Sequence, residues 1–328
     1  MKGITVQSFG SPDVLNYTTL PDPVAGENEI LIEVRGASIN SADIQARSGK
    51  YHLGKNLPFT PGIDVAGVAA SVGQKVKTIK KGDHVIDFPS TGSYAEQAVA
   101  QEHLCFVIPP EINFKAAAAV PIVAGTITHM LTEIARIQPG ESILVHGASG
   151  GVGTTAIQVA KQCKAGKIFG SVGSLRKGTY VQDLGAEATV DYNDPDYSTQ
   201  INQLTGGAGA DVILNPIGGV TLERDLHCLA PFGRLISFGR LADVPGSISP
   251  ETLYTTNRSV IGFSFGHFRK LRPALISNTM ERVIEMLRSE QLQMVIDSCY
   301  PLKEAARAHQ HLESREAIGK VLLYPITR

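Results

Sequence analysis

The stretch "LVHGASGGVGTTAIQVAK", Leu144 to Lys161, places four glycines within seven residues, between an apolar run and a helical pattern. Three of them, Gly147, Gly150 and Gly153, recur at intervals of three residues. Between a strand and a helix, such glycines allow a sharp bend, close approach of backbone amides to a pyrophosphate, and tight helix–strand packing. The helix N-terminus then presents its partial positive charge to the phosphates. The stretch predicts a dinucleotide-binding turn, although Ala148 stands at the first glycine position of the strict Gly-x-Gly-x-x-Gly pattern.

Strand and helix patterns alternate from this turn onwards. The expected strands cover residues 142–146, 168–172, 188–191, 211–214, 234–238 and 259–265, with helical patterns between them. Six strands with intervening helices predict an α/β fold with a doubly wound parallel sheet of the Rossmann type. We expect this dinucleotide-binding domain to span residues 123–266.

The first hundred residues have a different secondary-structure pattern. Short apolar or alternating runs at 30–34, 65–72, 84–88 and 94–100 are bounded by Gly- and Pro-rich segments, with no helix between them. This pattern indicates an antiparallel, barrel-like and β-rich unit. The tail after residue 266 is expected to fold back onto it, so this domain is discontinuous and comprises residues 1–122 and 267–328.

Composition excludes several classes of protein. With 30 Lys and Arg against 31 Asp and Glu, the chain lacks the basic excess of a nucleic-acid-binding protein. Its four cysteines form no Cys-x-x-Cys pair, which argues against a disulfide framework and a Cys-rich zinc site, and favours a reduced, cytoplasmic setting. The most apolar segment, residues 116–125, is too short to cross a bilayer. No nucleic-acid or membrane partner is expected.

The segment after the second Rossmann strand predicts which dinucleotide is bound. NAD-binding domains usually carry an Asp or Glu there, which hydrogen-bonds the ribose 2′-hydroxyl. The window from Ile168 to Tyr180 contains no carboxylate and instead offers Ser174, Arg176 and Lys177. Cations and a hydroxyl suit the 2′-phosphate of NADPH, so NADPH is the expected cofactor.

The whole chain resembles the zinc-independent quinone oxidoreductase group of the medium-chain dehydrogenase/reductase superfamily. The likeness is carried by "INSADIQARSGKY", "PGIDVAGVAASVG", "KKGDHV", "GSYAEQ", "HGASGGVG", "GRLISFG" and "LESREAIGK". It implies that the β-rich unit is a GroES-like catalytic domain. Because the superfamily commonly dimerises through the edge strand that corresponds to residues 259–265, it also implies a homodimer.

The resemblance also predicts whether the chain binds a catalytic zinc ion. Zinc alcohol dehydrogenases of this superfamily bind catalytic zinc through a Cys ahead of an x-x-Asp turn and through a Gly-His-Glu segment. Here Asn40 and Ile63 stand at the Cys and His positions, and neither supplies a thiolate or an imidazole. We therefore expect no metal, and NADPH-dependent hydride transfer to a quinone or an α,β-unsaturated carbonyl. In such substrates the negative charge spreads into a phenolate or enolate that a hydrogen-bond donor can hold.

The resemblance assigns four candidate catalytic residues to the segment over the nicotinamide: Asn40, Asp43, Arg47 and Tyr51. Asn40 and Tyr51 are expected to donate hydrogen bonds to the substrate oxygen, with Tyr51 as the proton donor, whereas Asp43 orients Arg47 or caps a helix. The expected cofactor-binding residues are Gly147, Gly150, Gly151, Val152, Gly153, Gly173, Ser174, Lys177, Tyr192, Phe238, Gly239, Phe263, Phe265 and Arg315. His129 and Asn215 stand where relatives usually carry Tyr and Asp, so their roles stay open.

Two other functions remain compatible with these residues. One is a zinc-type alcohol dehydrogenase with atypical ligands, and the other is a non-catalytic protein that binds NADPH. The glycine turn alone does not distinguish them, because all three functions need the nucleotide fold.

Overall fold

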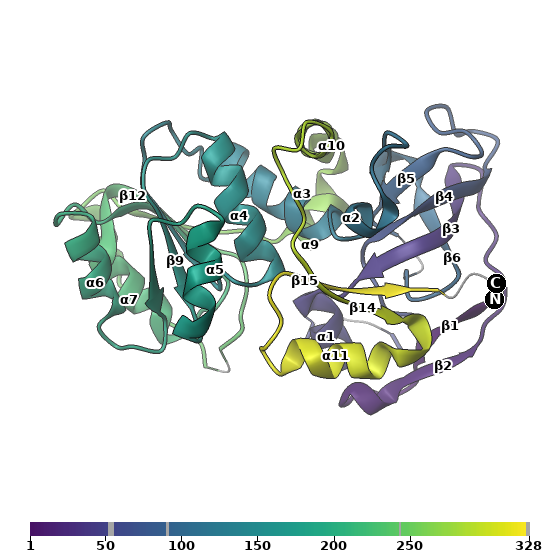
Figure 1. The fold of residues 1–328 in the computed structure, drawn as a ribbon, viewed down its shortest axis with the longest axis horizontal. Helices are drawn as coiled ribbons and strands as arrows, with labels where there is room; N and C mark the ends of the chain where they lie inside the picture. The colour runs from purple at the N-terminus through teal and green to yellow at the C-terminus, as the bar shows by residue number, and fades with distance from the viewer. Residues whose placement is uncertain (52–55, 90–91, 243, 326–328) are drawn as a thin grey trace. The chain divides into compact units, whose positions relative to one another are not determined.

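The computed structural model describes residues 1–51, 56–89, 92–242 and 244–325. The chain divides into two units: Met1–Gly125 together with Gly266–Arg328, and Thr126–Phe265 (Figure 1). The first unit is therefore built from both ends of the chain, and the second from one continuous segment.

The second unit contains a six-stranded parallel sheet. In space its strands follow the order β10 (Ala188–Asp191), β9 (Ile168–Val172), β8 (Ile143–His146), β11 (Ala210–Asn215), β12 (Leu229–Ser237) and β13 (Ser259–Gly262). This is the 3-2-1-4-5-6 order of a doubly wound Rossmann sheet, which confirms the predicted fold class. The chain reverses its direction of winding between β8 and β11, and ligands of such sheets bind outside the carboxyl ends of the strands at this point.

Helices cover both faces of this sheet. The connections β8–α4–β9 and β9–α5–β10 use α4 (Gly151–Gln162) and α5 (Gly178–Asp183), whereas α6 (Tyr197–Leu204) and α7 (Val220–Cys228) follow β10 and β11. Because the crossover connections are right-handed, α4 and α5 lie on one face of the sheet and α6 and α7 lie on the other. The central strands are buried on both sides and therefore read as continuous apolar runs, as in "ILVH" of β8.

Two elements of this region depart from a regular pattern. Helix α3 (Pro121–His129) is followed by a π-helical turn, Met130–Ile134. There the Thr132 hydroxyl donates to the Thr128 carbonyl at 2.9 Å, and the Ala135 amide reaches back five residues to Met130. The strand expected over 259–265 ends at Gly262, and α9 (Phe265–Leu271) follows, which the apolar pattern did not predict.

The first unit is a mostly antiparallel β structure. β3 (Glu29–Ser38) pairs with β4 (Val65–Val72), β6 (Gln97–Gln101) and β15 (Lys320–Tyr324). β5 (His84–Asp87) links β4 to β7 (Cys105–Val107), and β14 (Ile296–Pro301) lies parallel to β15. The buried faces of these strands supply one core, whose members include Ile30, Ile32, Val34, Val65, Val85, Ala98 and Cys105.

Shorter elements complete the first unit. The chain begins with a hairpin of β1 (Lys2–Val6) and β2 (Leu15–Thr19). The helices are α1 (Ser41–Arg47), α2 (Phe114–Ala118), α10 (Ile276–Arg288) and α11 (Ala305–Glu313), and α8 (Pro250–Tyr254) belongs to the second unit. In the described part of the chain no helix combines the length and the apolar character that crossing a bilayer requires.

Candidate functional site

The glycine turn joins β8 to α4 and allows the helix to start close to the strand. Gly147 has φ +65°, a backbone conformation that residues other than glycine rarely adopt. A Cβ on Gly153 would lie 2.3 Å from the carbonyl oxygen of Gly147 and 2.4 Å from Cα of Ala148, so no side chain fits there. Gly150 is the N-cap of α4, and Gly151 and Val152 are its first residues. The free amides of this helix start therefore lie at the carboxyl edge of the sheet, where a phosphate would bind.

A second group of candidates meets at the end of β9. A Cβ on Gly173 would lie 2.3 Å from Oη of Tyr192, so the Tyr192 hydroxyl rests against the Gly173 backbone. Ser174 is the N-cap of the 3-10 turn that ends at Lys177. The structure thus brings the predicted residues Gly173, Ser174 and Tyr192 together, with Lys177 one turn further on.

The predicted aromatic residues lie at the carboxyl ends of β12 and β13. The Phe263 amide donates to the Ser237 carbonyl at 2.9 Å, and the Phe263 ring stacks on His129 with centroids 5.8 Å apart. Phe265 packs against Phe263 at 6.3 Å. Burial lowers the pKa of His129, whereas Glu133 acts in the opposite direction. The residue at the usual Tyr position is therefore a buried imidazole within an aromatic cluster.

The neighbouring loop holds the other two candidates. The Phe238 amide donates to the Asn215 carbonyl at 3.1 Å, and a Cβ on Gly239 would lie 2.6 Å from the Pro216 carbonyl oxygen. The loops after β11 and β12 are thus packed against each other, with Gly239 at their closest approach.

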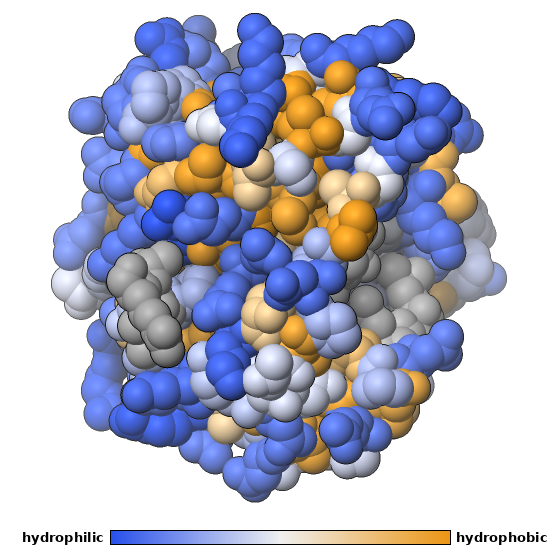
Figure 2. Space-filling model, turned by 90° about the vertical axis from the view of Figure 1, so that its right-hand side faces the viewer, coloured by the Kyte–Doolittle hydropathy of each residue, from blue (hydrophilic) through white to orange (hydrophobic). Residues whose placement is uncertain are grey.

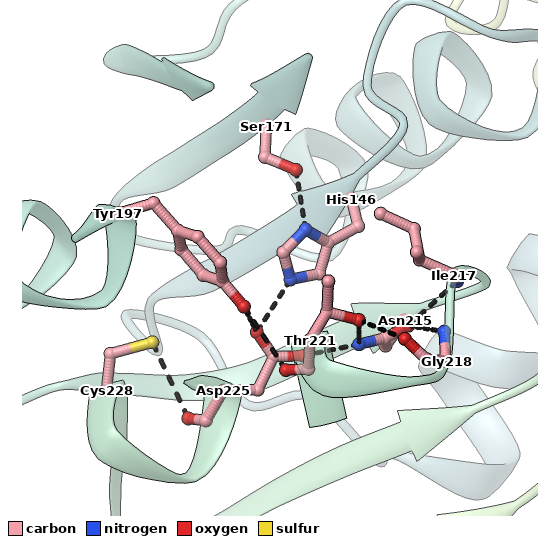
Figure 3. A network of polar contacts seen from close by, with 9 residues as sticks. All are labelled: His146, Ser171, Tyr197, Asn215, Ile217, Gly218, Thr221, Asp225 and Cys228. Atoms are coloured by element: carbon pink, nitrogen blue, oxygen red, sulfur yellow. Dashed lines mark hydrogen bonds and ion pairs between the residues drawn. The ribbon is translucent and has the colours of Figure 1, made fainter. Parts of the chain in front are cut away.

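Beneath the sheet edge lies a buried polar network centred on Asp225 (Figure 3). Nε2 of His146 lies 2.7 Å from Oδ1 of Asp225, and the Tyr197 hydroxyl donates to the same oxygen at 2.7 Å. Oδ2 of Asp225 accepts from the Asn215 amide at 2.6 Å. His146 ends β8 and Asn215 ends β11, so Asp225 ties together the two strands at the reversal point of the sheet. Burial, and then the charge of Asp225, raise the pKa of Tyr197.

This network gives a physical reason for Asn215. Its side-chain oxygen accepts from the amides of Ile217 and Gly218, both at 2.8 Å, while its amino group donates to Asp225 and Thr221. An aspartate at this position would place a carboxylate oxygen against that of Asp225. The neutral amide avoids this repulsion and fixes the loop after β11.

Two predicted residues of the first unit, Asn40 and Asp43, belong to a second buried cluster. The Asn40 backbone amide donates to the Asp43 carboxylate at 2.9 Å. Asp43 therefore caps the N-terminus of α1, which is one of the two roles predicted for it. The Asn40 side chain accepts from Lys320 Nζ at 2.7 Å and donates to Asp64 at 3.1 Å. Arg47 lies elsewhere, paired with Glu313 at 2.7 Å.

Arg47 therefore does not meet Asp43 in any hydrogen bond that we observe among the described residues. Its guanidinium also donates to the Gly10 carbonyl at 3.1 Å and contacts Nδ1 of His309 at 3.3 Å. Burial lowers the pKa of His309 to about 3, so this imidazole is neutral. These contacts connect α1 to α11 and give Arg47 a structural function.

Two further candidates also lie in the first unit. Tyr51 is half-buried, and Arg315 is exposed just after α11.

The charge of the Asp43 cluster predicts a pH dependence of stability. Burial, and then the nearby Asp64 charge, raise the pKa of Asp43 from 3.8 to about 7. The folded chain thus binds a proton more tightly than the unfolded chain, which stabilises the fold fully at low pH and is lost as the pH rises through 7. At ~1.4 kcal/mol per pH unit, we expect the free energy of unfolding to fall by about 2 kcal/mol between pH 5 and pH 7.

Urea unfolding at both pH values measures this change. The reference is Asp43→Asn, which cannot ionise and should show a shallower fall with pH. If the free energy of unfolding fell equally with pH in both proteins, Asp43 would not be the group responsible.

The residues of these two networks that sequence analysis did not identify are buried ionisable side chains. His146, Asp225 and Tyr197 in the second unit, and Asp64 and Lys320 in the first, are each 2% exposed or less, apart from Lys320 at 3%. An Asp or Lys inside an apolar strand or helix pattern was the only available signal. It does not reveal the partner, because His146 and Asp225 are far apart in the sequence.

One surface groove of the first unit lies away from the candidate residues. Apolar residues, framed by hydrophilic ones, reach the surface on the side shown in Figure 2. A groove of about 750 Å³ in the first unit is lined by apolar and charged residues, among them Ile79, Phe106, Lys77 and Glu102. None of the candidate residues lines it, so we do not place the site there.

Within residues 1–51, 56–89, 92–242 and 244–325, no group of three or more His, Cys, Asp or Glu side chains could hold a metal ion. At the Asn40 position, the side-chain oxygen already accepts from the Lys320 ammonium. This donor set does not fit zinc, because a cation is bound where a ligand would be needed.

Known proteins match the chain over its whole length. Family models described as "Alcohol dehydrogenase GroES-like domain" and "Zinc-binding dehydrogenase" match residues 26–110 and 151–297. The quinone oxidoreductase of Lama guanicoe is 35% identical over 333 residues, covering 98% of this chain and 97% of that protein. The structure of Escherichia coli quinone oxidoreductase complexed with NADPH matches with a TM-score of 0.92 at 30% identity, covering 99% and 100% of the two chains. The structure of mycobacterial Rv1454c complexed with NADPH has the same TM-score and coverage at 29% identity.

Proposed function

Since the chain belongs to the quinone oxidoreductase group of the medium-chain dehydrogenase/reductase superfamily, we propose that it transfers hydride from NADPH to a quinone or an α,β-unsaturated carbonyl without a metal. In this proposal the GroES-like first unit is the catalytic domain, and the Rossmann second unit binds the dinucleotide. The observation that carries it is the glycine turn at the carboxyl edge of a 3-2-1-4-5-6 sheet, where Gly153 leaves no room for a side chain.

NADPH supplies the hydride, and the chain's own residues bind and orient it. The amides at the start of α4, from Gly150 to Gly153, would bind the pyrophosphate. The backbone of Phe238, Gly239 and Phe263, with the Phe265 ring, would hold the nicotinamide at the ends of β12 and β13. Arg315 would reach the phosphates. The two related structures that contain NADPH support the choice of this cofactor.

The end of β9 would select NADPH over NADH. Lys177 and Ser174 would bind the 2′-phosphate, with Tyr192 against the adenosine, because charge-assisted hydrogen bonds to phosphate are strong. We expect Lys177→Ala to raise the dissociation constant for NADPH about tenfold and leave that for NADH unchanged. Fluorescence titration with both dinucleotides measures this. Equal losses for both would show that Lys177 does not read the 2′-phosphate.

Metal independence is supported by Asn40, Ile63 and Lys320. The isoleucine side chain has no ligand atom, asparagine is a poor zinc ligand, and the Lys320 ammonium binds the Asn40 oxygen. Without a Lewis acid, a substrate that spreads its negative charge into an enolate or phenolate is reduced more readily than a plain ketone. Tyr51 would supply the proton, and the Asn40 side chain would lie beside the substrate oxygen with Asp43 keeping α1 in place.

The test is NADPH and NADH consumption, measured in parallel with a panel of quinones and 2-alkenals, together with zinc analysis of the purified protein. We expect turnover with NADPH and less than stoichiometric zinc. Stoichiometric zinc would favour a zinc-type alcohol dehydrogenase with atypical ligands. Tight NADPH binding without turnover would favour a non-catalytic binding protein.

We further propose a homodimer formed through β13. This strand is an edge of the six-stranded sheet, and unpaired edges favour strand pairing. Light scattering at micromolar concentration should give the mass of a dimer, and Ile261→Lys should shift it to a monomer because edge lysines oppose pairing. A monomeric wild-type protein would contradict this. The four cysteines, all within the described residues, form no disulfide, consistent with the proposed cytoplasmic setting.

A further inference from the structure

The loop after β12 is held in place by the loop after β11. The Leu241 amide donates to the carbonyl oxygens of Pro216 and Ile217, at 3.2 and 3.0 Å. The Ala242 amide also donates to the Ile217 carbonyl, at 2.8 Å. Because the backbones of the two loops are hydrogen-bonded to each other, a displacement of the loop after β11 moves the loop after β12 as well.

Asn215 sets the conformation of the loop after β11. Its side-chain oxygen accepts from the amides of Ile217 and Gly218, and Gly218 has φ +74°. Its amino group donates to Oδ2 of Asp225 at 2.6 Å and to the Thr221 hydroxyl at 2.9 Å. The side chain is 0% exposed, and both its acceptor and both its donor positions are used. This one amide therefore joins the end of β11, the turn after it and α7.

The direction in which the Asn215 amide faces is fixed from both sides. The two backbone amides of the turn can only donate, so they require the side-chain oxygen, and the amino group must face Asp225. The Asp225 carboxyl group is anchored in turn, because His146 of β8 and Tyr197 of α6 both contact its Oδ1. Among the described residues, these are the two ionisable side chains that hydrogen-bond this carboxyl group.

The loop after β12 carries part of the proposed nicotinamide site. The backbone of Phe238 and Gly239 is proposed to hold the nicotinamide, and Gly239 lies closest to the loop after β11. Hydride transfer needs the reacting carbons about 3–3.5 Å apart, and a misplacement of about 1 Å can lower the rate about 100-fold. The amides proposed to bind the pyrophosphate belong to a different turn, at the start of α4. A shift of the loops can therefore change the reaction geometry without removing the phosphate contacts.

We propose that Asn215 is a positioning residue for hydride transfer: held by Asp225, it fixes the loop after β11 and, through that loop, the backbone that holds the nicotinamide. Resting on the proposed function, this role goes beyond it by assigning a residue that acts through the loop after β12 and does not touch the reacting atoms.

Asn215→Asp keeps the shape of the side chain but replaces its amino group by an oxygen. That oxygen would face Oδ2 of Asp225, so the two carboxyl groups must share a proton or separate. At pH 9 we expect separation, and a single-turnover rate constant with the best quinone or 2-alkenal about 30-fold below that of wild type. At pH 6 a shared proton keeps the groups together, so the ratio to wild type should be closer to one. A rate constant within about threefold of wild type at pH 9 would overturn the proposal.

Two further results distinguish positioning from a merely structural role. The dissociation constant for NADPH should stay within about threefold of wild type, and an equally large loss of affinity would refute a specific effect on hydride transfer. If Asn215→Asp only destabilised the fold, fewer molecules would react, so the amplitude of the single turnover would fall while its rate constant stayed the same. That outcome would also refute the proposal.

The double variant Asn215→Asp/Asp225→Asn exchanges the two groups. The amide at position 225 can donate to position 215 and still accept from Tyr197, so a donor again faces an acceptor. We expect the rate constant to return to within about threefold of wild type at both pH values. No recovery would mean that the contact with Asp225 does not set the loop. Asn257→Asp is the matched control, because it makes the same change at an exposed position just before β13, and it should behave as wild type.

Pulsed hydrogen exchange of the cofactor-free protein measures the coupling of the loops without turnover. At pH 9 the amides of Leu241 and Ala242 should exchange at least about tenfold faster in Asn215→Asp than in wild type, and the double variant should restore them. Unchanged exchange at these two amides would refute the connection between the loops. A wild-type protein that reduces no quinone or 2-alkenal would refute the proposed function, whereas an active wild type matched by Asn215→Asp would refute only the role of Asn215.

Discussion

Replacement of Asp225 by alanine should lower the free energy of unfolding by about 3–5 kcal/mol, because it removes one partner of a buried hydrogen-bonded charge. His146, Tyr197 and Asn215 would each lose an acceptor where no water reaches them. Unsatisfied buried donors cost far more than the net value of the bonds they made. Urea unfolding followed by circular dichroism measures the loss.

The matched control is Asp183→Ala. Asp183 is an exposed carboxylate at the end of α5, and its removal should change stability by no more than about 0.5 kcal/mol. If Asp225→Ala were as stable as this control, the network at the sheet edge would contribute nothing to the fold.

Gly153→Val should weaken NADPH binding by at least about 100-fold, the equivalent of losing two charge-assisted hydrogen bonds to phosphate. A Cβ at this position would overlap the backbone of Gly147 and Ala148, so the first turn of α4 must move away from β8. The amides that are proposed to hold the pyrophosphate move with it. Titration by NADPH fluorescence gives the affinity, and far-ultraviolet circular dichroism checks that the helices persist.

Gly206→Asn serves as the comparison. Gly206 also has positive φ, +66°, but no atom lies within 4 Å of its Cβ position, and asparagine tolerates this conformation. Its NADPH affinity should match wild type. An unchanged affinity in Gly153→Val would place the pyrophosphate elsewhere.

The sequence predicted the second unit well because its signals are local. Apolar runs such as "ILVH" and "IFGSV" are short, bounded and fully buried, and each is followed by a helical pattern. The strand at 259–265 was too long because Phe263 and Phe265 continue the apolar run, yet their side chains pack in a cluster with His129 rather than in a strand. Apolar spacing does not distinguish these two environments.

The candidate site was predictable only in part, for a related reason. Asp43 could be assigned as a cap because its partner Asn40 is three residues away. Lys320, which binds the Asn40 side chain, is 280 residues from it, and nothing in "GKVLLY" indicates that contact. The pairing of Arg47 with Glu313 could not be predicted either, because Glu313 is 266 residues away. Long-range pairs of buried charges depend on tertiary packing that no local pattern encodes.

The position of β15 constrains how the protein is made. Leu322 and Leu323 pair with Ser38 and Ala37 of β3, so the sheet of the first unit incorporates a strand that the ribosome produces after all the others. The second unit is continuous and can fold while synthesis proceeds. Until the last strand emerges, the end of β3 around Ala37 and Ser38 stays unpaired on the side that β15 later covers, and this exposed edge is open to chaperones or to misassociation.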